Sequence, residues 1–261
     1  MKLIKELKLA KEIAIIAGEK ILEIYKQDFD VEYKADETPL TEADLSANAI
    51  IVDAIKLNYP DHAILSEEMV DDFDRLENDW CWIIDPVDGT KEFVKKNDEF
   101  TVNIALAFRG EVVLGVVYAP VYGELYYAVL ASGAFIEIHG EKKEITVSSR
   151  HSELRALKSR SHISLKYAKV IEKHKSEIST LTKMGSSLKG CKIAAGEYDM
   201  YYNFGSKTSV WDTAAMEIIV LEAGGAFSDL YDNRIDYSEK EVKNINGFKI
   251  LNDIANDILK E

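Results

Sequence analysis

One stretch constrains this chain more than any other: residues 85–90, with the sequence Asp-Pro-Val-Asp-Gly-Thr. It follows the apolar run 80–84, which predicts a buried strand that ends in two carboxylates. Such carboxylates repel each other, and burial raises their pKa unless a cation lies between them. Pro86 restricts one backbone angle and Gly89 frees another, so both carboxylates and the Val87 carbonyl can point at one place. Oxygen ligands of this kind favour Mg²⁺ or Mn²⁺ over Zn²⁺, whereas an ordinary Asp-Gly turn would explain only part of the stretch.

Composition narrows the class of partner. The chain has 261 residues, 47% of them hydrophobic and only four of them proline, so it is a globular chain of one large domain or two closely packed halves. A formal net charge of −14 argues against nucleic acid or an anionic membrane as partner. A small anionic substrate remains compatible with this charge if bound cations reverse the local field.

The sequence also predicts the compartment. The longest apolar run near the N-terminus, residues 13–17, is too short for a signal peptide, and no later run reaches the ~20 apolar residues of a membrane span. Cys81 and Cys191 stand far apart without metal-site spacing, which favours two reduced, buried thiols. We therefore expect a cytoplasmic protein with no membrane span.

The periodicity of apolar residues predicts mixed helices and strands. An antiparallel meander is expected first, and alternating strands and helices follow a composition shift near residues 147–153. Helices are predicted over residues 2–27, 187–195 and 211–223, and two more are predicted to begin at 41–44 and at 165. Strands are predicted over residues 31–33, 63–65, 101–108, 112–119, 125–129, 154–159, 180–184 and 198–202.

Two further acids, Glu67 and Asp212, could point at the same cation, and these two acids and Asp44 each have an ordinary interpretation. Asp44 lies three residues after Thr41, which is the spacing of a helix-capping pair. Glu67 follows the strand at 63–65, although paired glutamates on a loop are usually just solvated. Asp212 lies at a helix start, where the helix dipole alone favours an acid.

Several motifs together resemble a known family. The pair Glu67-Glu68, the stretch 85–90, and Trp211-Asp-Thr-Ala-Ala215 with its trailing Gly-Gly resemble the signatures of the inositol monophosphatase and fructose-1,6-bisphosphatase superfamily, in order and spacing over almost the whole chain. The segments 88–93, 100–106, 159–162 and 185–189 are similar to its 3′(2′),5′-bisphosphate nucleotidase branch. Inositol monophosphatases usually have Thr-Asn where this chain has Lys91-Glu92.

The resemblance implies roles for the acids. Two or three Mg²⁺ ions, which Mn²⁺ can replace, would be held by Glu67, Asp85, the Val87 carbonyl, Asp88 and Asp212. Asp44 and Thr90 would position and deprotonate the attacking water. The amides of Gly89 and Thr90, at a turn expected to open a short helix, can bind phosphate oxygens. The resemblance further implies inhibition by Li⁺ and Ca²⁺.

The resemblance also suggests substrate residues. His162, Ser186 and Lys189 match nucleotide-contacting positions of the branch, although each could be an ordinary loop, cap or surface residue. One departure lies at 201–204, where Tyr-Tyr-Asn-Phe replaces the usual Tyr-Pro-Arg. The missing Arg would be a natural partner for a second phosphate, and Lys207 is a candidate replacement.

The implied fold is an α+β protein, a layered α/β/α/β/α sandwich. We expect an N-terminal α+β half (1–150) with the metal motifs and a C-terminal α/β half (151–261) that completes the site. The implied activity is Mg²⁺-dependent removal of the 3′-phosphate from adenosine 3′,5′-bisphosphate. Two alternatives stay open: an inositol or sugar phosphatase with the same mechanism, and a binding protein without catalysis. A homodimer is also compatible with the resemblance.

Overall fold

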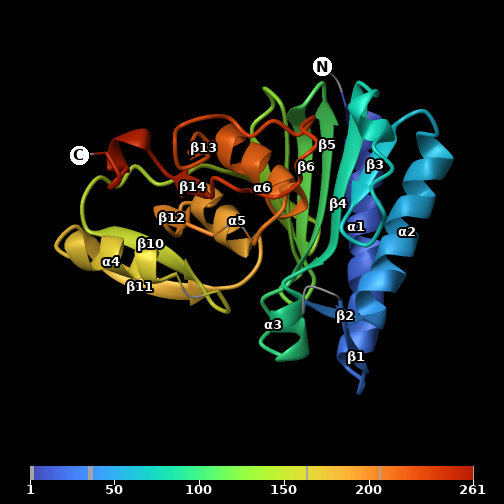
Figure 1. The fold of residues 1–261 in the computed structure, drawn as a ribbon, viewed down its shortest axis with the longest axis horizontal. Helices are drawn as coiled ribbons and strands as arrows, with labels where there is room; N and C mark the ends of the chain where they lie inside the picture. Colours follow the sequence, from blue (N-terminus) through green and yellow to red (C-terminus); the bar gives the residue numbers. More distant parts are fainter. Residues whose placement is uncertain (1–2, 35–37, 163, 206, 261) are drawn as a thin grey trace.

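The chain folds into stacked layers of helices and sheets. The computed structural model describes residues 3–34, 38–162, 164–205 and 207–260. From α1 and α2 at one end to α4 at the other, the layers follow the order helices, sheet, helices, sheet, helix (Figure 1). This is the α/β/α/β/α order that the resemblance implies.

The first layers contain the N-terminal elements. These are α1 (Ile4–Tyr25), β1 (Val31–Tyr33), β2 (Pro39–Thr41), α2 (Glu42–Asn58), β3 (Ala63–Ser66), a 3-10 turn η1 (Asp74–Leu76), β4 (Trp80–Asp88), α3 (Thr90–Val94), β5 (Thr101–Phe108), β6 (Glu111–Ala119), β7 (Glu124–Val129), β8 (Ala134–Ile138) and β9 (Glu141–Ile145). Strands β3 to β9 form a seven-stranded sheet in chain order, and each neighbouring pair is antiparallel except β3 with β4. The predicted meander is therefore present.

Strand β4 separates two hydrophobic cores. Trp82 and Ile84 belong to the core under α1 and α2, whereas Cys81 and Ile83 belong to the core on the other face. Side chains of a strand alternate between faces, so a strand covered on both faces needs an unbroken apolar run. This burial explains the run that precedes the two carboxylates.

The remaining layers contain the C-terminal elements. These are β10 (Leu154–Ser159), α4 (Leu165–Lys173), β11 (Ile178–Met184), α5 (Leu188–Ala194), β12 (Met200–Asn203), α6 (Val210–Glu222), β13 (Ala226–Ser228), β14 (Phe248–Leu251) and a 3-10 turn η2 (Ile254–Asn256). The five-stranded sheet has the order β11-β10-β12-β14-β13, with β10 parallel to both neighbours and the other pairs antiparallel. The predicted strand over 198–202 is wrong at its start, because β12 begins only at Met200.

Helix α6 lies between the two sheets. Its residues 213–220 are all buried, as expected for a helix that is covered on all sides. A Cβ atom at Gly115 of β6 would lie 2.4 Å from the Ala215 carbonyl oxygen, so only glycine allows this close approach of helix to strand. The buried residues on both sides of α6 form one core, and the division of the chain at residue 150 stays a prediction.

The structure also bears on the predictions for the cysteines and for membrane-spanning helices. Cys81 and Cys191 are both free and buried. Within the described ranges, each helix is too short or too polar to cross a membrane.

Candidate active site

Three carboxylates meet where the two sheets face each other. Asp85 and Asp88 come from the end of β4 and Asp212 from the start of α6, and one oxygen of each lies within 4.8 Å of the other two. Burial is the main cause that raises the pKa of both Asp85 and Asp212, and the neighbouring acids raise it further. Asp85 Oδ2 is buried without a hydrogen-bond partner. An oxygen-only set with an unpaired buried oxygen fits a hard cation such as Mg²⁺.

A β-bulge brings the first two carboxylates together. Asp85 pairs with Asn103 and Asp88 with Thr101, so β4 has one residue more than β5 between these pairs. In a regular strand, residues three apart would point to opposite faces. The extra residue reverses this alternation and allows both carboxylates to face the same side. The Val87 amide donates to Asp85 Oδ1 at 3.0 Å and closes the turn.

Residues from other strands and helices hold Asp88. Its Oδ2 accepts from Asn103 Nδ2 at 3.1 Å and from the amide and the hydroxyl of Ser187, both at 2.6 Å. Asn103 Nδ2 also donates to Ser187 Oγ at 2.9 Å. Asn103 and Ser187 lie in two segments of the resemblance, but no role was predicted for either residue.

Asp212 takes part in a helix capping box and also belongs to the carboxylate cluster. Ser209 and Asp212 form a capping box at the start of α6, in which the Ser209 amide donates to Asp212 Oδ2 at 2.5 Å. The same side chain therefore satisfies a helix terminus and contributes a carboxylate oxygen to the cluster.

Asp44 uses its two carboxylate oxygens for different partners. Oδ2 accepts from the amide and the hydroxyl of Thr41, at 2.8 and 2.7 Å. Oδ1 accepts from the Thr90 hydroxyl, whose oxygen lies 3.3 Å away, and the same hydroxyl lies 3.2 Å from the Val87 carbonyl oxygen. Burial raises the pKa of Asp44 to about 6, although the hydrogen bonds from Thr41 lower it. The structure thus brings Asp44 and Thr90 together.

Glu67 is the predicted ligand that lies outside the cluster of three. Its Oε1 accepts from Lys34 Nζ at 2.9 Å, and the same ammonium group donates to Glu68 at 2.6 Å. Glu67 still borders the cluster, because its charge contributes to the raised pKa values of Asp85 and Asp212. A lysine therefore supplies the positive charge at Glu67.

The turn after β4 requires glycine. Gly89 has a φ of +94°, and a Cβ atom there would lie 2.9 Å from the Glu99 carbonyl oxygen. Helix α3 begins directly after it, at Thr90. Phosphate binding by the amides of Gly89 and Thr90, and a ligand role for the Val87 carbonyl, stay predictions.

One predicted substrate residue, Ser186, lies against this turn, and a second, Lys189, contacts Ser186. Ser186 has a left-handed backbone (φ +47°), and its Cβ lies 3.4 Å from the position that a Gly89 Cβ would take. Lys189 of α5 is buried and donates to the Ser186 carbonyl at 2.6 Å. Burial lowers the pKa of Lys189, and the charges of nearby acids, Asp88 first, raise it.

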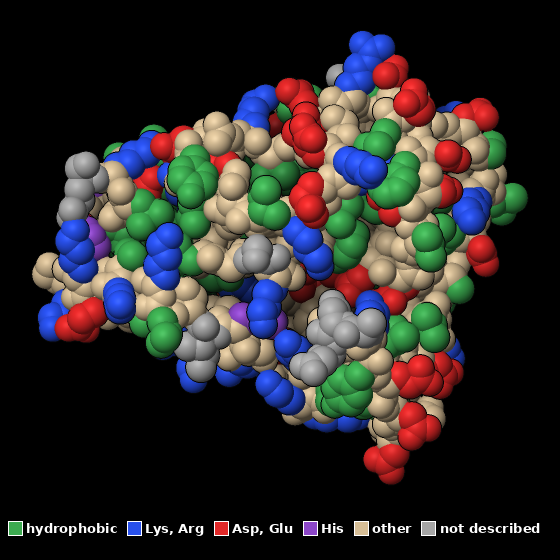
Figure 2. Space-filling view, viewed as in Figure 1, with side chains coloured by type: hydrophobic (Ala, Val, Ile, Leu, Met, Phe, Trp, Pro, Cys, Tyr) green, Lys and Arg blue, Asp and Glu red, His purple; other side chains and the backbone are tan. Residues whose placement is uncertain are grey.

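The third predicted residue, His162, lies among lysines. Although His162 is exposed, partial desolvation of its ring, followed by the charges of Lys91, Lys207, Lys189 and Lys95, lowers its pKa to about 4. Figure 2 shows acidic side chains within a hollow near the middle of this face, with Lys and Arg side chains and a His close to its edge. One side of the hollow therefore suits an anion.

The departure at 201–204 has a structural consequence. Asn203 Oδ1 accepts from the Gly205 amide at 2.8 Å, so this side chain closes a local turn. The Tyr202 hydroxyl donates to Asp257 in the core at 2.9 Å, whereas the Tyr201 ring lies 5.2 Å from the Lys189 ammonium. Lys207 is close enough for its charge to act on His162.

Comparisons with known proteins show which family and relatives this chain resembles. The model of the inositol monophosphatase family matches residues 3–258. The 3′(2′),5′-bisphosphate nucleotidase CysQ of Salmonella typhimurium is 39% identical over 246 residues, which are 92% of this chain and 96% of the relative. The Buchnera aphidicola protein of the same name is 42% identical over 231 residues, 87% of this chain and 85% of that one.

Solved structures agree with the sequence matches. CysQ from Bacteroides thetaiotaomicron superposes with a TM-score of 0.83 at 35% identity and covers 95% of this chain and 97% of its own. The Thermotoga maritima IMPase reaches 0.82 at 31% identity, over 95% of this chain and 92% of its own. Fold and matches together define a metal-dependent phosphatase. The chain belongs to the inositol monophosphatase family, and the predicted family and fold are confirmed.

Proposed function

We propose that this chain is a Mg²⁺-dependent phosphomonoesterase that converts adenosine 3′,5′-bisphosphate to AMP and phosphate. The observation that carries the proposal is the buried cluster of Asp85, Asp88 and Asp212 beside the Asp44–Thr90 pair. The substrate class is supported by relatives named 3′(2′),5′-bisphosphate nucleotidase that are 39% and 42% identical to this chain.

The residues divide the chemistry among them. Asp85, Asp88 and Asp212, joined by Glu67 and the Val87 carbonyl, would hold the cations. When bound, Mg²⁺ would neutralise the phosphate dianion and make the attacking water more acidic. Thr90 would orient that water and pass its proton to Asp44 Oδ1, because Thr41 occupies the other carboxylate oxygen. A base with a pKa of about 6 is well matched to proton transfer near neutral pH.

The lysine-lined side of the hollow would receive the rest of the substrate. The amides of Gly89 and Thr90 would bind the reacting phosphate, while His162, Ser186 and Lys189 would contact the nucleotide. Lys207, whose charge reaches His162, would face the second phosphate in place of the missing Arg. The substrate would thus be a small phosphorylated molecule, and cytoplasmic location and homodimer formation stay predictions.

One observation favours a second candidate. Asn203 stands where the nucleotidase branch usually has Arg, and its side chain is engaged in a turn. Without that Arg, the same cations and the same Asp44–Thr90 pair would serve an inositol or sugar monophosphate equally well.

A phosphate-release assay with Mg²⁺ tests both candidates. The panel would contain adenosine 3′,5′-bisphosphate, AMP, inositol 1-phosphate and a sugar phosphate at equal concentrations. We expect the bisphosphate to have the highest kcat/KM. Preference for inositol 1-phosphate or the sugar phosphate would favour the second candidate. No release from any member would leave a binding protein without catalysis and overturn the proposal.

A further inference from the structure

A second depression lies apart from the candidate active site and shares no residue with it. It has a volume of about 540 Å³ and is lined by residues 148–152 (Ser-Ser-Arg-His-Ser) with Arg155 and Gly196. No Asp or Glu is among these lining residues, although the chain as a whole has a net charge of −14. The lining offers two guanidinium groups and the hydroxyls of Ser149 and Ser152, which are hydrogen-bond donors suited to an anion. The Ser148 hydroxyl donates to Asp199 instead, and His151 Nε2 lies 3.9 Å from Asp253 Oδ2.

Arg155 is held in a fixed position on one side of this depression. Its Nε donates to Asp199 Oδ2 at 2.9 Å, and its Nη2 donates to Asp199 Oδ1 at 2.7 Å and to the Gly196 carbonyl at 2.9 Å. Asp199 is fully buried beneath it. Nη1 takes part in none of these bonds, so one edge of an already ordered guanidinium remains for a ligand.

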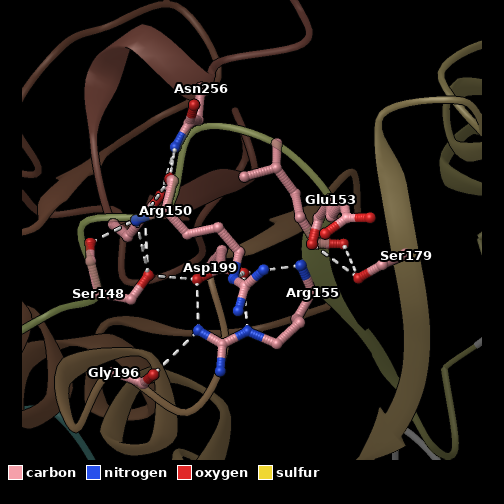
Figure 3. Close-up of polar contacts among 10 residues, drawn as sticks. Ser148, Arg150, Glu153, Arg155, Ser179, Gly196, Asp199 and Asn256 are labelled. Atoms are coloured by element: carbon pink, nitrogen blue, oxygen red, sulfur yellow. Dashed lines mark hydrogen bonds and ion pairs between the residues drawn. The ribbon is translucent and has the colours of Figure 1, made fainter.

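Arg150 provides a second guanidinium from the same segment. Its Nε lies 3.8 Å from Asp199 Oδ2, and its side chain is 41% exposed. The backbone beneath it is ordered, because the Arg150 carbonyl accepts from the buried side chains of Asn252 and Asn256, at 2.9 and 2.8 Å. Figure 3 shows Arg150 and Arg155 both reaching towards Asp199. Two guanidinium groups share one carboxylate, which leaves a positive charge without a carboxylate partner in the lining.

We propose that this depression is a second anion site that binds the phosphate group of a small molecule. Arg150 and Nη1 of Arg155 contact the phosphate oxygens, and the hydroxyls of Ser149 and Ser152 are further donors. The volume of about 540 Å³ leaves room for a small molecule that carries the phosphate group. His151 and Ser152 also line a neighbouring depression of about 560 Å³, whose lining includes Glu153, Glu177 and Asp257, so the phosphate group belongs on the arginine side.

Calorimetric titration of the full chain with inorganic phosphate and pyrophosphate tests this site. The titration is done in EDTA at constant ionic strength, so the experiment does not depend on Mg²⁺ or on the proposed activity. We expect one saturable site per chain that binds pyrophosphate more tightly than phosphate. Arg150→Gln should weaken binding about tenfold or more, the effect of losing one charge-assisted contact, and Arg150→Lys should weaken it less.

Two matched variants complete the test. Arg234→Gln removes an exposed Arg that pairs with Glu111 elsewhere on the surface, and it should leave binding unchanged. Lys207→Gln removes a charge at the candidate active site, and it should also leave binding unchanged. The proposal is overturned by the absence of saturable binding, by equal effects of Arg150→Gln and Arg234→Gln, or by weaker binding in Lys207→Gln alone.

Discussion

Helices α2 and α6 begin in the same way, and each places the Asp at its third position in different surroundings. Each starts with a capping box in which an Asp at the third helical position accepts from the amide of the cap residue, at 2.8 Å from Thr41 to Asp44 and at 2.5 Å from Ser209 to Asp212. In both boxes one carboxylate oxygen serves the helix. Each carboxylate also contributes an oxygen to the site.

The surroundings of the two carboxylates differ. For Asp44, Oδ1 lies 3.3 Å from the Thr90 hydroxyl, a neutral group that can donate a proton. For Asp212, one carboxylate oxygen lies within 4.8 Å of one oxygen each of Asp85 and Asp88, an arrangement that favours a bound cation when all three are charged. The same capping box therefore supports a proposed proton acceptor in α2 and a proposed cation ligand in α6. A cap role and a functional role are compatible, because a carboxylate has two oxygens.

Removal of metal should have the largest effect on activity, and it should distinguish the role of Asp44 in α2 from that of Asp212 in α6. We expect no turnover in excess EDTA and full recovery with Mg²⁺, because the clustered carboxylates and a phosphate dianion repel one another without cations. Mg²⁺ should also raise the thermal unfolding midpoint, since it binds the folded chain. This rise, measured by calorimetry, should persist in Asp44→Asn and disappear in Asp212→Asn. Full activity in excess chelator would contradict the site assignment.

Asp212→Asn should be the most damaging single substitution. The amide can still accept from Ser209, but it lacks the charge that a cation requires, so kcat/KM should fall on the order of 10³-fold with Mg²⁺. Without metal, the variant should unfold at a higher temperature than the parent, because burial and then repulsion by Asp88 and Glu67 raise the pKa of Asp212 in the folded chain. Ser209→Ala is the matched control, since it removes the hydroxyl of the capping box and keeps the carboxylate. Equal loss of activity in both variants would mean that Asp212 acts only through the capping box and not as a cation ligand.

Asp44→Asn should lower kcat by roughly 10²- to 10⁴-fold, the usual effect of losing a positioned base. Thr90→Ala should show a similar loss, and the double variant should be little worse, because the two groups act as a unit. The Mg²⁺ concentration for half-maximal activity should change little. Thr41→Ala, the control for the cap, should cost ~1 kcal/mol of stability and far less activity. If Asp44→Asn keeps turnover within about threefold of the parent, Asp44 is not the base and serves only in the helix capping box.

Local sequence signals account for most of the carboxylate geometry. The strand end at 85–90, the capping pair Thr41–Asp44 and the helix start at Asp212 are short-range patterns, and each was predicted from neighbouring residues. The capping partner of Asp212, Ser209, was not predicted. The bulge in β4 was not predicted, although it brings Asp85 and Asp88 to one face. A bulge is a property of a strand pair, and its position depends on the register with β5.

Long-range contacts explain what the sequence could not predict. The bonds that hold Asp88 come from Asn103, 15 residues away, and from Ser187, 99 residues away. Glu67 was expected among the cluster acids, and its ion pair with Lys34 joins residues 33 positions apart. Single-sequence patterns contain no signal for such pairs, because the fold alone decides which side chains meet.

The smallest expected effect concerns a second acid on α6, five residues after Asp212. Glu217 is buried, and it accepts a hydrogen bond from the Tyr237 hydroxyl. Burial raises its pKa from 4.5 to about 7, so this group contributes stability below pH 4.5 that is lost as the pH rises to 7. Glu217→Gln keeps the acceptor and removes the charge, and it should stabilise the chain by about 1–3 kcal/mol above pH 7 and little at pH 4.5. Chemical denaturation at both pH values measures this difference. Asp53→Asn, at an exposed position of α2, should change stability little at either pH, and a similar gain there would mean that the effect reflects net charge rather than burial on α6.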